Sequence, residues 1–236
     1  TSGQLSIRWI ADELNLFLNE TIGTKDYDYI VASDTDSVYV RLGKLIERFL
    51  PDCTDTEKIV NFLDNSSEKI IQPLIDKKYE ELAQMMNAYE NKMFMGREVI
   101  AERGVWTAKK RYALNVWDSE GVRYEEPKLK IMGIETTRSS TPAIVREKLK
   151  NAIRMILTKE EKDIQEYVAE FRDEFFSCEP EEIAFPRSVS NLEKWESSSE
   201  IYISATPIAV KGSLIYNHYI KKLKLEEKYE KIQQGD

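Results

Sequence analysis

The sequence has few of the residues that build disulfide-linked or histidine-rich metal proteins. It contains two cysteines and one histidine in 236 residues. Two cysteines cannot form a disulfide framework, and their scarcity fits a reducing compartment. The single His218 excludes a metal site built from several histidines. No apolar run approaches the ~20 residues that span a bilayer, and no signal peptide is visible, so we expect a cytoplasmic protein without a membrane partner.

The overall charge is also unlike that of a typical nucleic-acid-binding protein. The net charge is −8 and the pI is about 5.1, whereas the footprint of such proteins is usually basic. The local distribution differs from the total, because residues 107–112 carry three positive charges and no negative one. The length and the 42% hydrophobic content fit one large soluble domain or two small ones. The chain opens at Thr1 directly in a helical pattern, so we expect a piece of something longer.

The stretch from residue 30 to residue 40 is the most informative part of the chain. Asp34 and Asp36 lie one residue apart between two apolar, β-branched runs, which read as strands joined by a tight turn. Positions i and i+2 of a strand face the same way, so both carboxylates can aim at one point. Two negative charges at such a short distance repel each other, and a hard divalent cation that binds both carboxylates through oxygen removes the repulsion. The pattern therefore predicts a magnesium site at a hairpin tip.

A plainer interpretation of the same residues is an ordinary solvated turn. Asp, Thr and Ser are common turn formers, and an Asp-x-Asp turn needs no metal. The motif alone does not separate these two interpretations, and the rest of the chain has to decide between them.

Hydrophobic periodicity predicts a mixture of helices and antiparallel strands. Helices are expected at residues 3–22, 44–49, 56–91 (interrupted near 65–67 and 73), 142–177 and 208–225. Strands are expected at residues 28–32, 37–42, 93–103, 105–117, 122–125, 129–133 and 200–203, with turns at 102–104 and 118–121. The strand pattern gives way to helices near residues 136–142, which is the clearest candidate for a domain boundary.

The expected strand at 105–117 carries basic and aromatic residues together. Alternation along a strand places Lys110 and Tyr112 on one face, with Lys109 and Arg111 on the other. Such a strand can contact a nucleic-acid backbone. A divalent cation, phosphates and backbone contacts together are the chemistry of nucleotidyl transfer. The plainer alternatives are a core-packed ring for Tyr112 and a solvated face for Lys109 and Arg111.

Several of these segments resemble known motifs. Residues 33–37 (Ser-Asp-Thr-Asp-Ser) resemble the acidic hairpin of family B DNA polymerases, and residues 110–112 (Lys-Arg-Tyr) match the family's Lys-x-Tyr motif. Residues 97–100 resemble the strand just before that motif. Residues 109–116, 126–135 and 139–142 look very like the replicative polymerases of large tailed phages, and residues 3–5 resemble the start of the helix before the family's acidic hairpin. The resemblance is thinner but traceable through residues 185–189 and 210–217. The resemblance covers essentially the whole chain and is strongest over residues 1–142, and several motifs in the right order are more specific than any one of them.

The resemblance implies a role for each candidate residue. Asp36 would be the direct metal ligand, and Asp34 its neighbour in the catalytic pair. Glu98 would be an auxiliary acid near the metals. Lys110 and Tyr112 would bind primer-template DNA near the primer terminus, and Arg111 is a further DNA-binding candidate. The implied cofactor is Mg²⁺, two ions in the complete polymerase, and the implied partners are primer-template DNA and dNTP.

The implied fold is α+β. An antiparallel palm sheet packed with helices would occupy residues 1–140, and a mostly helical partial thumb would occupy residues 141–236. The family's upstream palm strand with its metal-binding aspartate, its lysine-bearing helix and its exonuclease domain have no counterpart here. We therefore expect a polymerase fragment that is inactive alone and needs the missing upstream segment as a partner.

The sequence departs from the family pattern in two further places. Ala32-Ser33 stand where the family usually has Tyr-Gly, which removes a packing ring and the glycine of a tight turn. The stretch 102–104 is short beside phage relatives, which carry a longer glycine-rich insertion.

Two other functional classes use parts of the same pattern. Nucleotide-sugar glycosyltransferases hold Mn²⁺ and a diphosphate with a strand followed by Asp-x-Asp, but that fold needs parallel βαβ units before the motif. A non-catalytic nucleic-acid-binding sheet would use Lys110 and Tyr112, but it would have no use for paired Asp34 and Asp36.

Overall fold

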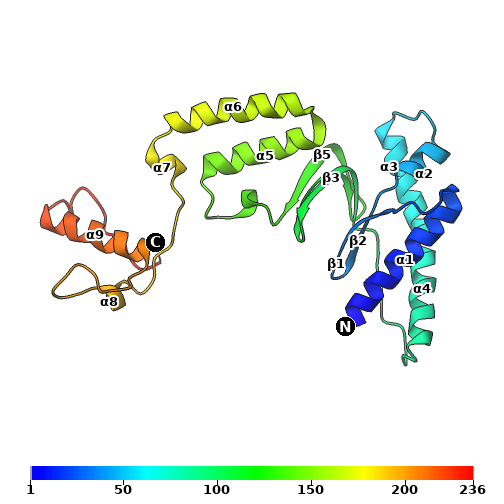
Figure 1. Cartoon of the computed structure of the whole chain (residues 1–236), viewed down its shortest axis with the longest axis horizontal. Coiled ribbons are helices and arrows are strands. Elements are labelled where there is room, and N and C mark those ends of the chain that lie inside the picture. Colours follow the sequence, from blue (N-terminus) through cyan, green and yellow to red (C-terminus); the bar gives the residue numbers. More distant parts are fainter. Residues whose placement is uncertain (1, 236) are drawn as a thin grey trace. The chain divides into compact units, whose positions relative to one another are not determined.

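The computed structural model describes residues 2–235, which form two compact units (Figure 1). The first unit contains residues 2–134 and 153–163, and the second contains residues 135–152 and 164–235. Helices and antiparallel sheets are both present, so the predicted α+β class is confirmed. Among the described residues, no helix combines the length and apolarity that crossing a membrane requires.

Helix α1 (Ser2–Ile22) opens the first unit as the periodicity predicts. Its buried side chains recur at helical spacing, with Ile10, Leu14 and Leu18 on one face. Gly23 follows with φ +77°, a left-handed conformation that ends a helix and that glycine adopts without strain.

Strands β1 (Ile30–Asp34) and β2 (Ser37–Val40) form the predicted antiparallel hairpin. Helix α2 (Gly43–Phe49) follows directly. The side chains of Val38 and Val40 pack among apolar residues of the neighbouring helices, which fixes which face of the hairpin is turned inward.

Helices α3 (Thr56–Ser66) and α4 (Gln72–Met85) are joined by a π-helical turn, η1 (Ser67–Ile71). The α-helix is interrupted at the predicted places, since α3 ends at Ser66 and α4 begins at Gln72, but the chain widens into a π-helix there and does not leave the helical path. Pro73 lies in the first turn of α4, where its missing N–H is tolerated. Helices α1 and α4 lie side by side (Figure 1) and bury a cluster made of Ile10, Leu14, Ile75, Tyr79 and Leu82.

A second sheet has the order β3 (Val99–Ala108), β4 (Arg111–Ser119) and β5 (Val122–Met132), with all neighbours antiparallel. The prediction of a turn at 102–104 is wrong, because β3 continues through these residues. The turn that joins β3 to β4 lies at Lys109 and Lys110. The predicted strands at 122–125 and 129–133 are one strand. Pro127 does not interrupt it because β5 is an edge strand, where a missing N–H is tolerated.

Gly104 explains why the sequence placed the turn wrongly. A methyl group at this position would lie 2.6 Å from Leu114 Cδ2 and 2.7 Å from the ring of Trp106. The glycine therefore permits a close approach inside a strand and does not mark a bend.

The long helical prediction at 142–177 resolves into two helices, α5 (Ala143–Thr158) and α6 (Glu161–Ser177). Within the first unit, Ile153 and Leu157 pack against Ala113 of the sheet. Within the second unit, Lys148 of α5 forms an ion pair with Glu174 of α6.

The rest of the second unit contains short helices and one longer one. These are η2 (Glu135–Thr137), α7 (Pro180–Ile183), α8 (Leu192–Trp195) and α9 (Ile208–Lys222). The strand predicted at 200–203 is reduced to a single bridge between Glu196 and Tyr202. Val189, Val210 and Leu214 form the small core that holds this region together.

A buried ion network fixes the end of the second sheet against α3. Asp118 is 1% exposed and accepts hydrogen bonds from Arg97, from Arg123 Nε at 3.1 Å and from the Gly121 N–H at 3.1 Å. Asp64 of α3 pairs with the same two arginines, Arg97 at 2.8 Å and Arg123 at 3.4 Å. Two carboxylates and two guanidinium groups thus balance each other in charge. Burial acts to raise the pKa of Asp118, but the arginine hydrogen bonds outweigh it and hold the pKa below its usual range.

We predict that Asp118→Asn destabilises the chain in a pH-dependent way. The pKa of Asp118 is lowered in the folded state, so its contribution is complete at neutral pH and is lost as the pH falls through the folded pKa. At pH 7 the variant should lose about 1–3 kcal/mol of unfolding free energy, because hydrogen bonds to a charged group are removed. Urea unfolding at pH 7 and at steps below pH 4 should show this difference shrinking. Glu125→Gln, an exposed carboxylate on β5, is the matched control, and a pH-independent difference would contradict the prediction.

Candidate functional site

The acidic hairpin tip is held by hydrogen bonds among its own residues. Thr35 has φ +41°, so the chain reverses within Thr35 and Asp36. The Asp36 N–H donates to the carbonyl of Asp34, and the Ser37 hydroxyl donates to the same carbonyl at 3.2 Å. Thr35 Oγ1 donates to the Asp34 carboxylate at 3.0 Å. The Asp-Thr-Asp-Ser sequence therefore forms a defined turn without the glycine that the family usually has there.

The two carboxylates of this tip have different surroundings. The Asp34 side chain is 26% exposed, and its Oδ2 lies 3.4 Å from Lys110 Nζ. Burial acts to raise the pKa of Asp34, but hydrogen bonds from Thr35 and Lys110 outweigh it and lower the pKa. Asp36 is exposed and lines a cavity. Asp34 thus already has a positive partner, whereas the Asp36 carboxylate is accessible to a ligand. Their convergence on one metal stays a prediction.

Lys110 reaches the hairpin because it lies in a turn. Residues 109 and 110 connect β3 to β4, and Lys110 has φ +60°. The prediction that Lys110 and Tyr112 share one face of a single strand is therefore wrong. Arg111 and Tyr112 are the first two residues of β4, and Arg111 is paired with Ala108. A turn lets the long side chain of Lys110 extend beyond the sheet and reach Asp34 in the other sheet.

Gly133 permits this turn to pack against the end of β5. A methyl group on Gly133 would lie 2.1 Å from the carbonyl oxygen of Lys110, and Gly133 also has φ +65°. Only glycine fits both requirements without a shift of the backbone.

Three aromatic rings lie beside the turn. The ring centroids of Tyr39 and Tyr112 are 5.3 Å apart, those of Tyr39 and Trp106 are 5.3 Å apart, and those of Trp106 and Tyr112 are 6.2 Å apart. Sequence reasoning missed Tyr39 and Trp106. The available signal for Tyr39 was alternation in β2, because Val38 and Val40 face the core and Tyr39 faces the other way.

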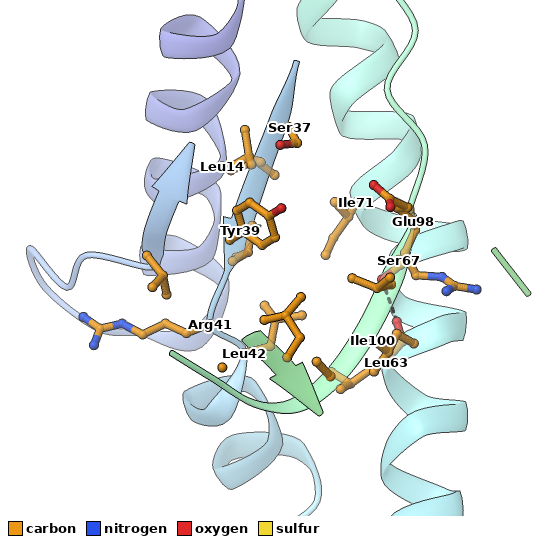
Figure 2. Close-up of a pocket in the computed structure, with 18 of the residues that line it drawn as sticks. Leu14, Ser37, Tyr39, Arg41, Leu42, Leu63, Ser67, Ile71, Glu98 and Ile100 are labelled. Atoms are coloured by element: carbon orange, nitrogen blue, oxygen red, sulfur yellow. Dashed lines mark hydrogen bonds between the residues drawn. The ribbon is translucent and has the colours of Figure 1, made fainter. Parts of the chain in front are cut away.

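A cavity of about 530 Å³ lies between β2 and the segment that leads into β3. Its lining includes residues 36–43 from one side, residues 95–104 from the other, and apolar side chains of α3, η1 and α4. Figure 2 shows Tyr39 extending from β2 toward the segment that carries Glu98. Asp36 and Glu98 line this same cavity, and Glu98 forms an ion pair with Lys130 at 2.5 Å. The structure therefore brings the predicted auxiliary acid to the cavity that Asp36 also lines.

The donor set of the hairpin suits a hard cation but is incomplete. Two carboxylates and backbone carbonyls offer only oxygen, which is what Mg²⁺ prefers over softer ligands. Among residues 2–235, no group of three or more His, Cys, Asp or Glu side chains is arranged to hold a metal ion.

Comparison with known proteins shows which class of protein the chain is similar to. The chain is 40% identical over 230 residues to a DNA-directed DNA polymerase of Enterobacteria phage T4, covering 94% of this chain and 26% of that protein. It is 41% identical over 230 residues to a DNA-directed DNA polymerase of Escherichia phage RB69, covering 94% of this chain and 25% of that protein. No family model matches the chain.

The predicted resemblance to phage DNA polymerases is thereby confirmed. The chain spans about a quarter of the length of the curated relatives it matches. Nearly the whole length of this chain is therefore similar to one part of such a polymerase.

We predict that Gly133→Ala displaces the Lys110 turn and destabilises the first unit. The close contact and the left-handed φ together should cost about 2–4 kcal/mol of unfolding free energy. Gly121→Ala is the matched control, because Gly121 has φ +84° but nothing within 4 Å of an added methyl group. It should cost only ~1 kcal/mol from backbone conformation. Urea unfolding of both variants checks the prediction, and equal losses would show that the contact with Lys110 is not tight.

Proposed function

We propose that this chain is part of a DNA-directed DNA polymerase that extends a primer 3′ end by nucleotidyl transfer. One observation carries the proposal: the acidic hairpin meets the Lys110 turn and the ring of Tyr112 beside it, in a chain similar to phage DNA polymerases over 94% of its length. The first unit would contribute one half of the palm, and the second would begin the thumb. Since both relatives are phage proteins, we place the chain in the cytoplasm of an infected cell.

In this proposal Asp36 and Asp34 hold the catalytic metals from one side. Two Mg²⁺ ions, when bound, activate the primer 3′-hydroxyl and stabilise the leaving pyrophosphate. The exposed Asp36 carboxylate would be the principal ligand of this chain. Asp34 would support it, with Lys110 limiting the repulsion between the two acids. Glu98 would act as an auxiliary acid at the edge of the cavity that Asp36 lines.

The turn beside the hairpin would contact the primer-template DNA. Lys110 and Arg111 supply positive charge that can bind phosphates. The side chain of Lys110 is 65% exposed. Tyr112 supplies a ring close to the same point. This local charge accounts for DNA binding by a chain whose net charge is −8. The dNTP would bind where its phosphates can reach metals held by Asp36 and Asp34.

The missing upstream polymerase segment is the proposed protein partner. The cavity between β2 and β3 supports this, because the two strands belong to different sheets and each is an edge strand. Edge strands expose unpaired N–H and C=O groups that a further strand can pair with. Trp106 lines the same cavity, and its buried Nε1 has no acceptor among the described residues. An extended segment of the partner would supply backbone hydrogen bonds to the edge strands and an acceptor for Trp106 Nε1.

The structure supports the two rival classes less well. A glycosyltransferase of the Asp-x-Asp type needs parallel strands before the motif, whereas the sheets of the described residues are antiparallel. A non-catalytic nucleic-acid-binding sheet would account for Lys110 and Tyr112. It would leave the paired acids at the hairpin tip without a purpose.

We predict that the chain alone does not extend a primer, because it supplies carboxylates from only one side of a two-metal site. Extension should appear when a polypeptide carrying the upstream segment of a related phage polymerase is added. The assay is primer extension in Mg²⁺ with each polypeptide alone and with both together. Synthesis by the chain alone would overturn the prediction, and a companion that is active by itself would make the assay uninformative and require a shorter companion.

Hydrogen exchange in the same mixture tests the proposed docking place. A companion with its catalytic aspartate replaced still has the strand, so binding can be followed without synthesis. Slower exchange in β2 and β3, with β5 unchanged as the internal control, is the expected result. Protection confined to β5 would place the partner elsewhere.

We predict that Asp36→Asn in the reconstituted polymerase lowers the rate of synthesis by ~10³-fold or more, since an amide keeps the shape but loses the charge that holds the metal. Primer-template binding, measured by fluorescence anisotropy, should change little. Asp52→Asn, which lies outside the site, is the control and should retain full synthesis. Retained synthesis by the Asp36 variant in Mg²⁺ would show that Asp36 is not a principal ligand.

A further inference from the structure

We propose that Tyr39 is a positioning residue that holds Tyr112 and the Lys110 turn at a fixed place relative to the acidic hairpin. The inference rests on the proposed polymerase function for its kinetic consequence. The structural part, a bridge between the two sheets built from aromatic side chains, can be tested without synthesis.

The first argument is topological. The hairpin belongs to the sheet β1–β2, and the Lys110 turn belongs to the sheet β3–β4–β5. No backbone hydrogen-bond ladder joins these sheets within the described residues, so side chains must set the position of one relative to the other. The ion pair between Lys110 and Asp34 joins them at the turn, but its lysine is 65% exposed, and exposed ion pairs hold geometry weakly.

The second argument is the ring geometry. The Tyr39 ring is tilted 60° to the Tyr112 ring and lies 69° from the Trp106 plane, so that it contacts both rings at once. Tilted and edge-on aromatic pairs at 4.5–7 Å are the favoured arrangements. Trp106 and Tyr112 are register partners on β3 and β4, so one ring from β2 meets a pair that already belongs to one sheet.

The third argument is the hydroxyl of Tyr39. It shares a hydrogen bond with the side chain of Tyr112, and Ser37 is a further neighbour. Burial, followed by this bond, raises the pKa of Tyr39 to about 12. The hydroxyl therefore stays protonated at neutral pH and remains able to donate. The hydroxyl contact thus adds to the ring packing that holds Tyr112 beside Tyr39.

These contacts predict on which step Tyr39 acts. The ring of Tyr39 contacts Tyr112 and Trp106, and Tyr112 is a proposed DNA-contacting residue. Loss of Tyr39 should therefore weaken the use of primer-template more than it slows the chemical step.

The kinetic test uses the reconstituted polymerase. Tyr39→Ala should raise the KM for primer-template by about tenfold, the factor that corresponds to losing two aromatic contacts, with kcat changed less than about threefold. Tyr39→Phe keeps the ring and should recover most of the loss. Tyr124→Ala on β5, whose ring packs on Lys128, is the control and should leave both constants unchanged.

A double-mutant cycle shows whether Tyr39 acts through Tyr112. In a Tyr112→Ala background, Tyr39→Ala should have little further effect on KM. Full additivity would overturn the proposal, and so would a fall in kcat with KM unchanged.

A spectroscopic test uses the isolated chain and needs no activity. Fluorotyrosine labelling allows the ¹⁹F signal of Tyr112 to be assigned by its loss in Tyr112→Phe. That signal should shift in Tyr39→Ala and stay in place in Tyr124→Ala, while thermal melting confirms that both variants are folded. An unmoved Tyr112 signal would overturn the bridge itself. A moved signal without reconstituted synthesis would instead count against the polymerase function, so the two failures are distinguishable.

Discussion

Two sheets that share no strand pairing must be held side by side by their side chains, and the candidate site depends on this constraint. The acidic hairpin comes from one sheet, and the basic turn comes from the other. On the side of the turn, their contacts include one ion pair, Asp34–Lys110, and one ring, Tyr39, set against a ring pair, while Val40 of β2 and Ile100 of β3 share a core cluster. A small change in either contact therefore moves functional groups relative to each other without unfolding either sheet.

The chain uses opposite charges in two distinct ways. At Asp118 one buried carboxylate, the partly exposed carboxylate of Asp64 and two arginines neutralise one another, which fixes the start of β3 and the end of β4 against α3. At Asp34 a single exposed lysine offsets one of two neighbouring acids and leaves the other accessible. The first arrangement is closed and serves stability. The second is open, and under the proposed function a divalent cation would complete it.

The sequence predicted the elements that have strong local signals. The first helix, expected at residues 3–22, and the Asp-x-Asp hairpin were both predicted correctly. The β3–β4 turn at residues 109 and 110 was missed for two reasons. A lysine gives no sequence signal for the left-handed φ that Lys110 adopts, and Gly104 suggested a turn earlier in the chain. The roles of Tyr39 and Trp106 were missed for a different reason: they depend on contact between separate sheets, which no periodicity within one strand records.

The left-handed backbone at Lys110 has a consequence for how this position can change over time. Glycine or asparagine would occupy that conformation with less strain, so folding stability alone favours replacing the lysine. The ion pair with Asp34 favours keeping the lysine, because neither glycine nor asparagine could form it. The close packing of Gly133 against the Lys110 carbonyl leaves little room for the turn to shift into another conformation. If Lys110 has the role proposed here, folding stability and function favour different residues at this position, and chains without that function would be expected to carry the smaller residues.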